Sequence, residues 1–301
     1  MSNQQSHINA KVFKDNDKIF VTQEVSRNLE PSIFSNYQSS IISYKDVILP
    51  IRKNPNYNLD LLDRVNVRLN NFSHRSEDFL TLDNDKINIL FAGCSETFGE
   101  SLPEKHSWPY HVMHELKKHN LNLGPEQILG FPGGSMTKIV RNIFKYVDKF
   151  GKPDYILLLA PDFARTCMYN LETETHQIKN NADILNIYKD TSYNILYDLF
   201  SSYCQQYELL RIFCKTNNIK LLSTSWHVES AYLMNKMYPE TFRDMYTENF
   251  LNYYQSSNFD EDYFNTLDKD FLNSAADNLH SGTVFHVSVG RFFSEWTKKI
   301  C

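Results

Sequence analysis

The sequence predicts an α/β protein, a three-layer α/β/α sandwich built on a parallel, flavodoxin-like sheet. Two apolar runs of strand length, residues 87–93 (INILFAG) and 155–160 (YILLLA), are typical of strands that are buried on both faces. Amphipathic stretches of helical length separate the predicted strands, and this alternation indicates βαβ units. Because such crossovers are right-handed, the helices are expected to cover both faces of the sheet.

The other elements follow from periodicity and from residues that break helices. Residues 138–150 carry apolar side chains on one helical face, and Gly151 and Pro153 end that helix. Residues 229–276 are polar, aromatic-rich and irregular, with short helices at most. The remaining predicted elements are helices at 108–118, 194–217 and 286–299 and strands at 128–129 and 220–225.

Residues 1–80 are predicted to form an N-terminal extension that packs on the main domain, residues 81–301. Short strands are expected at 18–22 and 40–44, and polar, Asn-rich stretches separate them. The region has too few apolar runs to form a core of its own, which argues against an independent small domain. The length of 301 residues is compatible with one large domain and such an extension.

The composition excludes some functions and favours a soluble, cytoplasmic protein. A net charge of −5 argues against a nucleic-acid partner bound through a broad basic face. The polar N-terminus lacks the apolar core of a signal peptide, and no run approaches the length of a transmembrane helix, so no membrane association is expected. The five cysteines are scattered without a C-x-x-C pair, which is typical of free thiols in a reducing compartment.

Three segments carry candidate chemistry, and two of them follow predicted strands, where a parallel sheet binds its ligands. In residues 93–99 (GCSETFG), Ser95 lies at the turn from strand to helix, either as a nucleophile or as a simple helix cap. In residues 130–135 (GFPGGS), the double glycine either offers a backbone N–H to an anion or forms an ordinary tight turn. In residues 277–282 (DNLHSG), Asp277 is placed to hold one ring nitrogen of a histidine, although D-x-x-H alone is weak evidence.

The combination of the three segments is more specific than any one of them. The chain order Ser95, Asp277, His280 is one of the known orders of a Ser/Asp/His triad. Together the segments resemble the SGNH hydrolase family, whose members are also called GDSL-like esterases. The family's first block, roughly G-D-S-x-T-x-G, matches residues 93–99 with Cys94 in place of the Asp, and its last block, D-x-x-H, matches the Asp and His of the candidate triad.

This resemblance, which covers about residues 65–301, implies the SGNH fold and an esterase, lipase or carbohydrate deacetylase activity. It implies that Ser95 attacks an ester or acetyl carbonyl and that His280, oriented by Asp277, takes the serine proton. It also implies an oxyanion hole formed by the backbone N–H groups of Ser95 and Gly134, with no metal and no cofactor. The expected substrate is a small acyl ester such as an O-acetylated carbohydrate, because residues 229–276 are polar and aromatic-rich and the chain lacks a lipid-like apolar run.

One position departs from the family pattern. The third block of the family, roughly P-D-x-V-x-x-x-x-G-x-N-D, begins at Pro153 and places its oxyanion-binding Asn on Phe163. Phenylalanine has no hydrogen-bond donor in its side chain, and the loss of one such donor typically lowers the rate by about 10²–10³-fold. Asn142, Arg165 and Asn194 are weak candidates to replace it. An alternative function therefore stays open, a weakly active or inactive module that binds a ligand or has a structural role.

Other polar residues are expected to be structural. Four histidines crowd one segment, but the sequence has no H-E-x-x-H pattern, and zinc sites usually need three or four protein ligands. They are His106, His111, His114 and His119. His227, which follows the strand predicted at 220–225, is a spare candidate base, while the side chain of Cys94 is expected to point into the sheet.

Overall fold

The computed structural model describes residues 40–43, 58–70, 72, 74–170, 175–179, 195–247 and 265–299, with the backbone alone for residues 40–43, 166–170, 175–179 and 195. The strands are β1 (Ser40–Ser43), β2 (Asn66–Leu69), β3 (Ile89–Gly93), β4 (Gln127–Gly130), β5 (Tyr155–Ala160), β6 (Thr166–Asn170), β7 (Thr175–Lys179) and β8 (Lys220–Ser225). The α-helices are α2 (Leu59–Leu62), α3 (Ser95–Phe98), α4 (Trp108–Lys117), α5 (Met136–Phe150), α7 (Ile195–Thr216), α8 (Val228–Met237) and α11 (Thr283–Lys298). Two short 3₁₀ turns are η2 (Glu104–His106) and η3 (Lys269–Phe271).

The central sheet has four strands in the order β4-β3-β5-β8, and every neighbouring pair is parallel. Counted along the chain, this order is 2-1-3-4, which is the beginning of the flavodoxin-like order. All residues of β3 and β5 are buried, as their uninterrupted apolar sequences predict. The predicted parallel, flavodoxin-like sheet is therefore confirmed.

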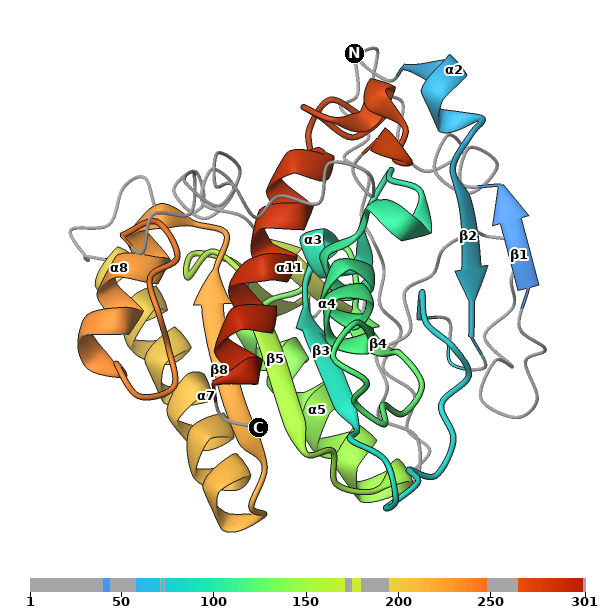
Figure 1. Ribbon diagram of the computed structural model, residues 1–301. Helices are drawn as coiled ribbons and strands as arrows, with labels where there is room; N and C mark the ends of the chain where they lie inside the picture. The colour runs from blue at the N-terminus through green and yellow to red at the C-terminus, as the bar shows by residue number, and fades with distance from the viewer. Residues whose placement is uncertain are drawn as a thin grey trace, which may run out of the picture.

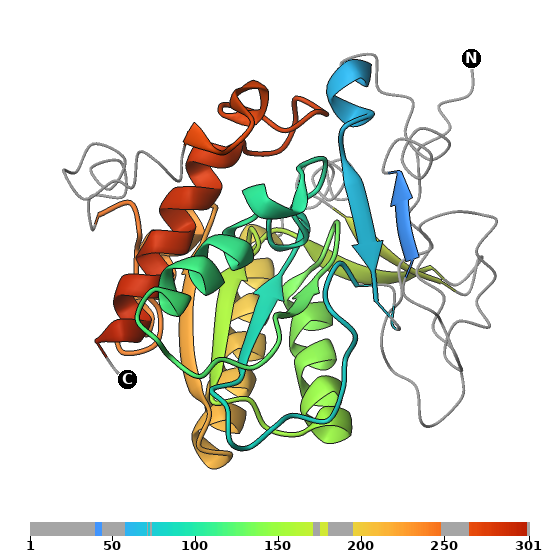
Figure 2. The ribbon, with the colours of Figure 1, turned by 45° about the vertical axis from the view of Figure 1, so that its right-hand side comes forward.

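Helices cover both faces of this sheet, which confirms the three-layer α/β/α sandwich. Figure 1 shows α4 and α11 in front of the sheet and α5 and α7 behind it, and the turned view in Figure 2 separates the same layers. The front helices pack on each other, as do the helices behind the sheet. Each layer arises because a helix with one apolar stripe buries that stripe against the sheet.

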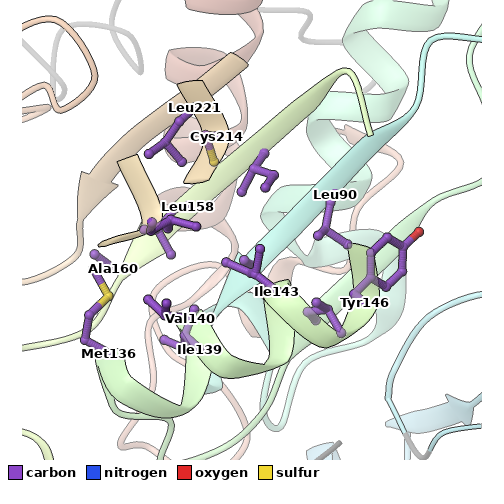
Figure 3. Close-up of a cluster of buried hydrophobic side chains, with 14 of the residues drawn as sticks. Leu90, Met136, Ile139, Val140, Ile143, Tyr146, Leu158, Ala160, Cys214 and Leu221 are labelled. Carbon is purple, nitrogen blue, oxygen red and sulfur yellow. The ribbon is translucent and has the colours of Figure 1, made fainter. Parts of the chain in front are cut away.

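The layer behind the sheet shows how periodicity becomes packing. Figure 3 shows Ile139 and Ile143 of α5 directed at Leu90 of β3 and Leu158 of β5, and all four side chains are fully buried. The spacing of four residues places both isoleucines on one face of α5. Tyr146 lies on the same buried face, and its hydroxyl donates a hydrogen bond to Gln127 Oε1 at 3.0 Å, so that its polar end is satisfied in the core.

The layer in front of the sheet is centred on Trp108, at the start of α4. Its ring is fully buried and stacks on Phe293 of α11 with 4.9 Å between the ring centroids. It also meets Phe91 of β3 edge to face at 5.3 Å, and its indole N–H donates to Thr97 Oγ1 at 3.3 Å. Trp108 therefore joins the sheet, α3 and α11 through one side chain.

We expect Trp108→Ala to lower the free energy of unfolding by about 3–5 kcal/mol, the usual effect of deleting a fully buried aromatic side chain. The loss combines the transfer free energy of the ring with the cavity left between Phe91 and Phe293. Urea denaturation followed by circular dichroism measures it. Lys117→Ala, on the exposed face of the same helix, is the matched control and should change stability by no more than about 0.5 kcal/mol. Equal values for the two variants would contradict this packing.

The described part of the N-terminal region packs on the main domain. β1 pairs with β2 in an antiparallel arrangement outside the central sheet, so the strand predicted at 40–44 is observed. Leu62 and Val67 are buried in a cluster with Phe98 of α3 and Phe271 of η3. The strand predicted at 18–22 lies outside the described residues, and the assignment of all of residues 1–80 to an extension stays a prediction.

Several elements were not predicted from the sequence, among them β2 and the antiparallel pair of β6 and β7 after β5. α8 is a short helix of the kind that residues 229–276 were expected to contain at most, and it forms because Ala231 and Met234 bury one side of an otherwise polar helix. In the described part of the chain, none of the helices combines the length and the apolar character needed to cross a membrane.

Candidate active site

Ser95 is the first residue of α3, and it follows β3 with only Cys94 between them. Gly93 makes this sharp turn possible, because a Cβ there would collide with the side chain of Thr97 and the carbonyl of Leu159. Cys94, not Ser95, occupies the cap position of α3, and no side chain caps that end. The capping role that was the alternative for Ser95 is therefore not observed, and its buried hydroxyl is available for another role.

Asp277 and His280 form a tight loop in front of α11. One carboxylate oxygen, Oδ1, accepts the backbone N–H groups of Leu279 and His280 at 3.0 and 3.1 Å. The other, Oδ2, lies 2.6 Å from His280 Nδ1. Asn278 adopts a left-handed conformation with φ of 54°, which asparagine tolerates better than most residues. The predicted Asp–His pair is thus formed by local turn geometry, and Asp277 fixes both the ring orientation and a proton on Nδ1.

Gly282 fixes where this loop ends. A Cβ at Gly282 would collide with the backbone of Asn273 and Ser274, so only glycine permits the close approach of the two chain segments. The backbone N–H of Ala275 donates to the carbonyl of His280 at 3.1 Å, which closes the loop into a narrow hairpin. The side chain of His280 is thereby held on a rigid support ahead of a long helix.

The second ring nitrogen of His280 faces a buried carboxylate. Nε2 lies 3.5 Å from Glu100 Oε2, and Glu100 is only 1% exposed. Burial alone would lower the pKa of His280, but the negative charge of Glu100 and the hydrogen bond to Asp277 outweigh it and raise the pKa to about 9. At neutral pH the imidazole is therefore mostly protonated on both nitrogens.

Glu96, the residue after the candidate nucleophile, ties the serine turn to the histidine loop. Its Oε1 accepts hydrogen bonds from the backbone N–H and the hydroxyl of Ser281 at 3.4 and 3.2 Å. Its Oε2 lies 3.3 Å from Nε2 of His286 in α11. Burial would raise the pKa of Glu96, but the contact with His286 and the charge of His280 hold it below its usual value. The carboxylate is therefore ionised at neutral pH.

The backbone of α4 orients the ring of His286. The N–H of Trp108 donates to His286 Nδ1 at 3.2 Å, and Nε2 faces Glu96 Oε2 at 3.3 Å. This chain of contacts links α4, α11 and α3, and it positions the loop of His280 beside the turn of Ser95.

Ser95 and His280 are near each other but are not joined by a hydrogen bond among the described residues. Glu100 connects them, because its backbone N–H donates to the carbonyl of Ser95 at 3.1 Å while its carboxylate faces His280. The Ser95 hydroxyl has Cys94 Sγ as a distant neighbour at 4.0 Å. The contact between Asp277 and His280 is thus observed, while the bond from Ser95 to His280 stays a prediction.

The glycine turn after β4 is tight. The N–H of Gly134 donates to the carbonyl of Phe131 at 3.2 Å, and Gly133 has a left-handed φ of 70°. The N–H predicted to bind an oxyanion is therefore already engaged in the turn, and an oxyanion would have to share it. The role of Gly134 in an oxyanion hole stays a prediction.

The position that departs from the family pattern is occupied by a packed side chain. The ring of Phe163 meets Phe200 edge to face at 5.4 Å, and its backbone N–H donates to Ser230 Oγ at 3.2 Å. Three residues were weak candidates to replace the missing donor. Asn142 is buried in α5, and Arg165 stacks on Trp226 at 5.0 Å. Asn194 lies outside the described residues. None of these positions is shown to reach Ser95.

The histidines of residues 106–119 have structural contacts. His106 Nδ1 lies 2.7 Å from Thr283 Oγ1, and burial lowers its pKa to about 3. His111 is fully buried, and burial lowers its pKa well below the usual value. The spare candidate base, His227, has Nδ1 at 3.0 Å from Ser230 Oγ and lies two strands away from β3.

Outside this histidine-rich segment, three residues have potential metal-ligand atoms close together: Glu100, Asp277 and His280. Asp277 and His280 are bonded to each other at 2.6 Å, so only His280 Nε2 and Glu100 are directed at a common point. Zinc sites usually need three or four protein ligands. The two remaining ligand atoms are fewer than such a site usually has.

Sequence reasoning missed Glu96 and Glu100. Both lie in the first motif or directly after it (GCSETFGE), and a helical turn separates them. The only signal for them in the sequence was that two carboxylates follow a candidate nucleophile closely. Their partners lie in a distant part of the chain, so the sequence did not indicate what they contact.

No protein-family model matches the sequence, and no curated protein matches it. Among solved structures, the chain is similar to a family 3 carbohydrate esterase of Clostridium thermocellum, at 14% identity and a TM-score of 0.40, over 71% of this chain and 96% of that chain. It is also similar to the psychrotrophic esterase EstA of Pseudoalteromonas sp., in a form inhibited by monoethylphosphonate, at 10% identity and a TM-score of 0.40, over 71% and 98% of the two chains. A member of the lipolytic G-D-S-L family of Veillonella parvula has 13% identity and a TM-score of 0.36, over 70% and 98%. Proteins at this level of similarity differ widely in function, so the residues of the site have to decide it.

Proposed function

We propose that the protein is a serine esterase of the SGNH type that hydrolyses a small acyl ester. The observation that carries this proposal is the Asp277–His280 pair, with 2.6 Å between Oδ2 and Nδ1, held by Glu96 against the turn that bears Ser95. A carboxylate that orients a buried imidazole beside a serine after a parallel strand is the arrangement that activates a serine nucleophile. No cofactor takes part in the proposed reaction.

The proposed reaction has two steps. Ser95 Oγ attacks the acyl carbonyl while its proton passes to His280 Nε2, and Asp277 stabilises the imidazolium that forms. His280 then returns the proton to the departing alcohol, and water hydrolyses the acyl-enzyme by the same route in reverse. The backbone N–H of Ser95 and that of Gly134 bind the oxyanion, the latter in competition with the carbonyl of Phe131.

The proposed substrate is a small acyl group on a polar alcohol, such as an O-acetylated carbohydrate. Trp226 at the carboxyl end of β8 supports this class, because its indole N–H is buried, has no hydrogen-bond partner among the residues that the structure describes and lies at the ligand-binding edge of the sheet. Arg165 covers the ring at 5.0 Å. An aromatic ring with an unused donor beside a guanidinium suits a polar, hydroxyl-rich ligand better than an acyl chain.

Covalent labelling with a fluorophosphonate tests the proposal, because this probe reacts with activated serines. The wild type is incubated near pH 9, where His280 is half in its base form, and analysed by intact mass and peptide mapping. We expect one adduct, on Ser95, that Ser95→Ala abolishes and His280→Ala slows by at least about 10³-fold. Ser202→Ala, an exposed serine of α7, is the matched control. An adduct that persists in Ser95→Ala, or none on folded wild type, would contradict a serine esterase.

A second candidate is a ligand-binding module without catalysis. Two observations favour it, the packed Phe163 at the position of the missing donor and the lack of a hydrogen bond between Ser95 and His280 among the described residues. It predicts no fluorophosphonate adduct at any pH, together with saturable binding of unmodified glycans by the folded protein. Binding that is equal in wild type and Ser95→Ala, without any turnover, would favour this candidate over the esterase.

A further inference from the structure

We propose that Glu100 is a positioning residue of this site, which holds the His280 ring from the side opposite Asp277 so that Ser95 must compete with its carboxylate for Nε2. The inference rests on the proposed function. Its geometric basis is one imidazole between two carboxylates, with Asp277 Oδ2 at 2.6 Å from Nδ1 and Glu100 Oε2 at 3.5 Å from Nε2. Nε2 is the atom that has to receive the serine proton.

The backbone around Glu100 is fixed on both sides, so its side chain starts from a defined position beside His280. Gly99 and Ser101 both have left-handed φ values, 68° and 61°. Arg75 is buried, and its guanidinium donates hydrogen bonds to the carbonyls of Gly99 and Leu102. The N–H of Glu100 itself is bonded to the carbonyl of Ser95 at 3.1 Å. The backbone of Glu100 is thus held by the same turn that presents the nucleophile.

The charges around His280 favour a ring that is protonated on both nitrogens. Three buried carboxylates supply negative charge near the ring: Asp277 of the same loop, Glu96 of α3 and Glu100 after α3. The positive guanidinium of Arg75 lies against the neighbouring backbone carbonyls, and the ring of His286 faces Glu96 from α11. Buried carboxylates at this distance stabilise an imidazolium strongly, because little water screens them.

The consequence is a resting state of the site in which His280 does not yet act as a base. His280 first loses its Nε2 proton to solvent, and the Glu100 carboxylate moves away from that nitrogen. Ser95 Oγ–H then donates to the free lone pair of Nε2, and the proton passes to His280 as the bond from Oγ to the acyl carbon forms. Glu100 therefore sets the pH at which the serine becomes a nucleophile and takes no part in bond formation itself.

Glu100→Gln tests this inference, because it keeps the size of the side chain and removes its charge. Glu104→Gln is the matched control, since Glu104 lies in the next turn, is partly exposed and pairs with Arg68. Two quantities are measured in each protein: the titration midpoint of the His280 ring, by NMR of histidine-labelled protein, and the pH dependence of the rate of fluorophosphonate labelling.

We expect Glu100→Gln to lower the NMR midpoint by at least one unit and to speed labelling at pH 7 by about tenfold, since one unit of pKa corresponds to a tenfold change in the base form. Glu104→Gln should leave both unchanged. If Glu100→Gln does not fold, Glu100→Asp, which withdraws the charge by one methylene, should lower the midpoint by less. An unchanged midpoint in folded Glu100→Gln would overturn the inference. If the midpoint falls but no variant is labelled, the result supports the role of Glu100 in holding the His280 ring and contradicts the proposed esterase function.

Discussion

Replacing Asp277 with asparagine is expected to lower kcat for a small ester by roughly 10⁴-fold and to leave the fold intact. Asparagine keeps Oδ1, which accepts the N–H groups of Leu279 and His280 at 3.0 and 3.1 Å, so the loop is retained. It replaces Oδ2, 2.6 Å from His280 Nδ1, with an NH₂ group. A donor at that place makes Nδ1 the acceptor and moves the ring hydrogen to Nε2, where it blocks the lone pair that should accept the serine proton.

The measurement is the hydrolysis of p-nitrophenyl acetate, with urea denaturation as the check on folding. Asp270→Asn provides the same chemical change at an exposed carboxylate that pairs with Arg64, and it should leave kcat at the wild-type value. If Asp277→Asn folded normally and retained the wild-type kcat, the Asp277–His280 pair would not take part in the reaction, and the binding module would become the better description.

The sequence predicted the central sheet well because its strands differ sharply from their surroundings. The runs at 155–160 and 220–225 correspond to β5 and β8 without a shift at either end. The continuous apolar residues of β5, bounded by turns, leave little choice of register in a sheet that is covered on both faces. By contrast, the bounds of α8 were not predicted within a segment expected to hold short helices at most, since its few apolar residues become meaningful only once the cluster that they complete is known.

The site was predictable where its geometry is local. Asp277 and His280 are three residues apart, and one turn with Asn278 in the left-handed region brings them together. The contact between Glu100 and His280 depends on how α3 packs against the loop before α11, and periodicity carries no information on such long-range contacts. Sequence reasoning therefore predicted the contact between Asp277 and His280 but missed the second carboxylate, which faces the other side of the ring.

The second large effect that we expect is a rise of activity with pH. Because the charge of Glu100 and the bond to Asp277 raise the pKa of His280 to about 9, roughly one molecule in a hundred has the base form at pH 7. The value of kcat/KM should therefore increase about 100-fold up to a plateau above pH 9. Initial rates of p-nitrophenyl acetate hydrolysis measure this increase after the rates of Ser95→Ala are subtracted, which removes spontaneous hydrolysis. A midpoint near 6.5 would mean that the base is not held between two carboxylates.

The same proton should link activity to stability with the opposite sign. The pKa of His280 in the folded protein lies above its ordinary value of 6.5, so the protonated ring contributes stability that is fully present below pH 6.5 and is lost as the pH rises through about 9. The contribution is on the order of 3 kcal/mol. Denaturation midpoints measured across this window should fall as kcat/KM rises, and Glu100→Gln should weaken both trends together. Stability that stops falling near pH 9, where kcat/KM reaches half of its plateau, would identify His280, between Asp277 and Glu100, as the group that controls both. A fall that ends at a clearly different pH would show that different groups control stability and catalysis.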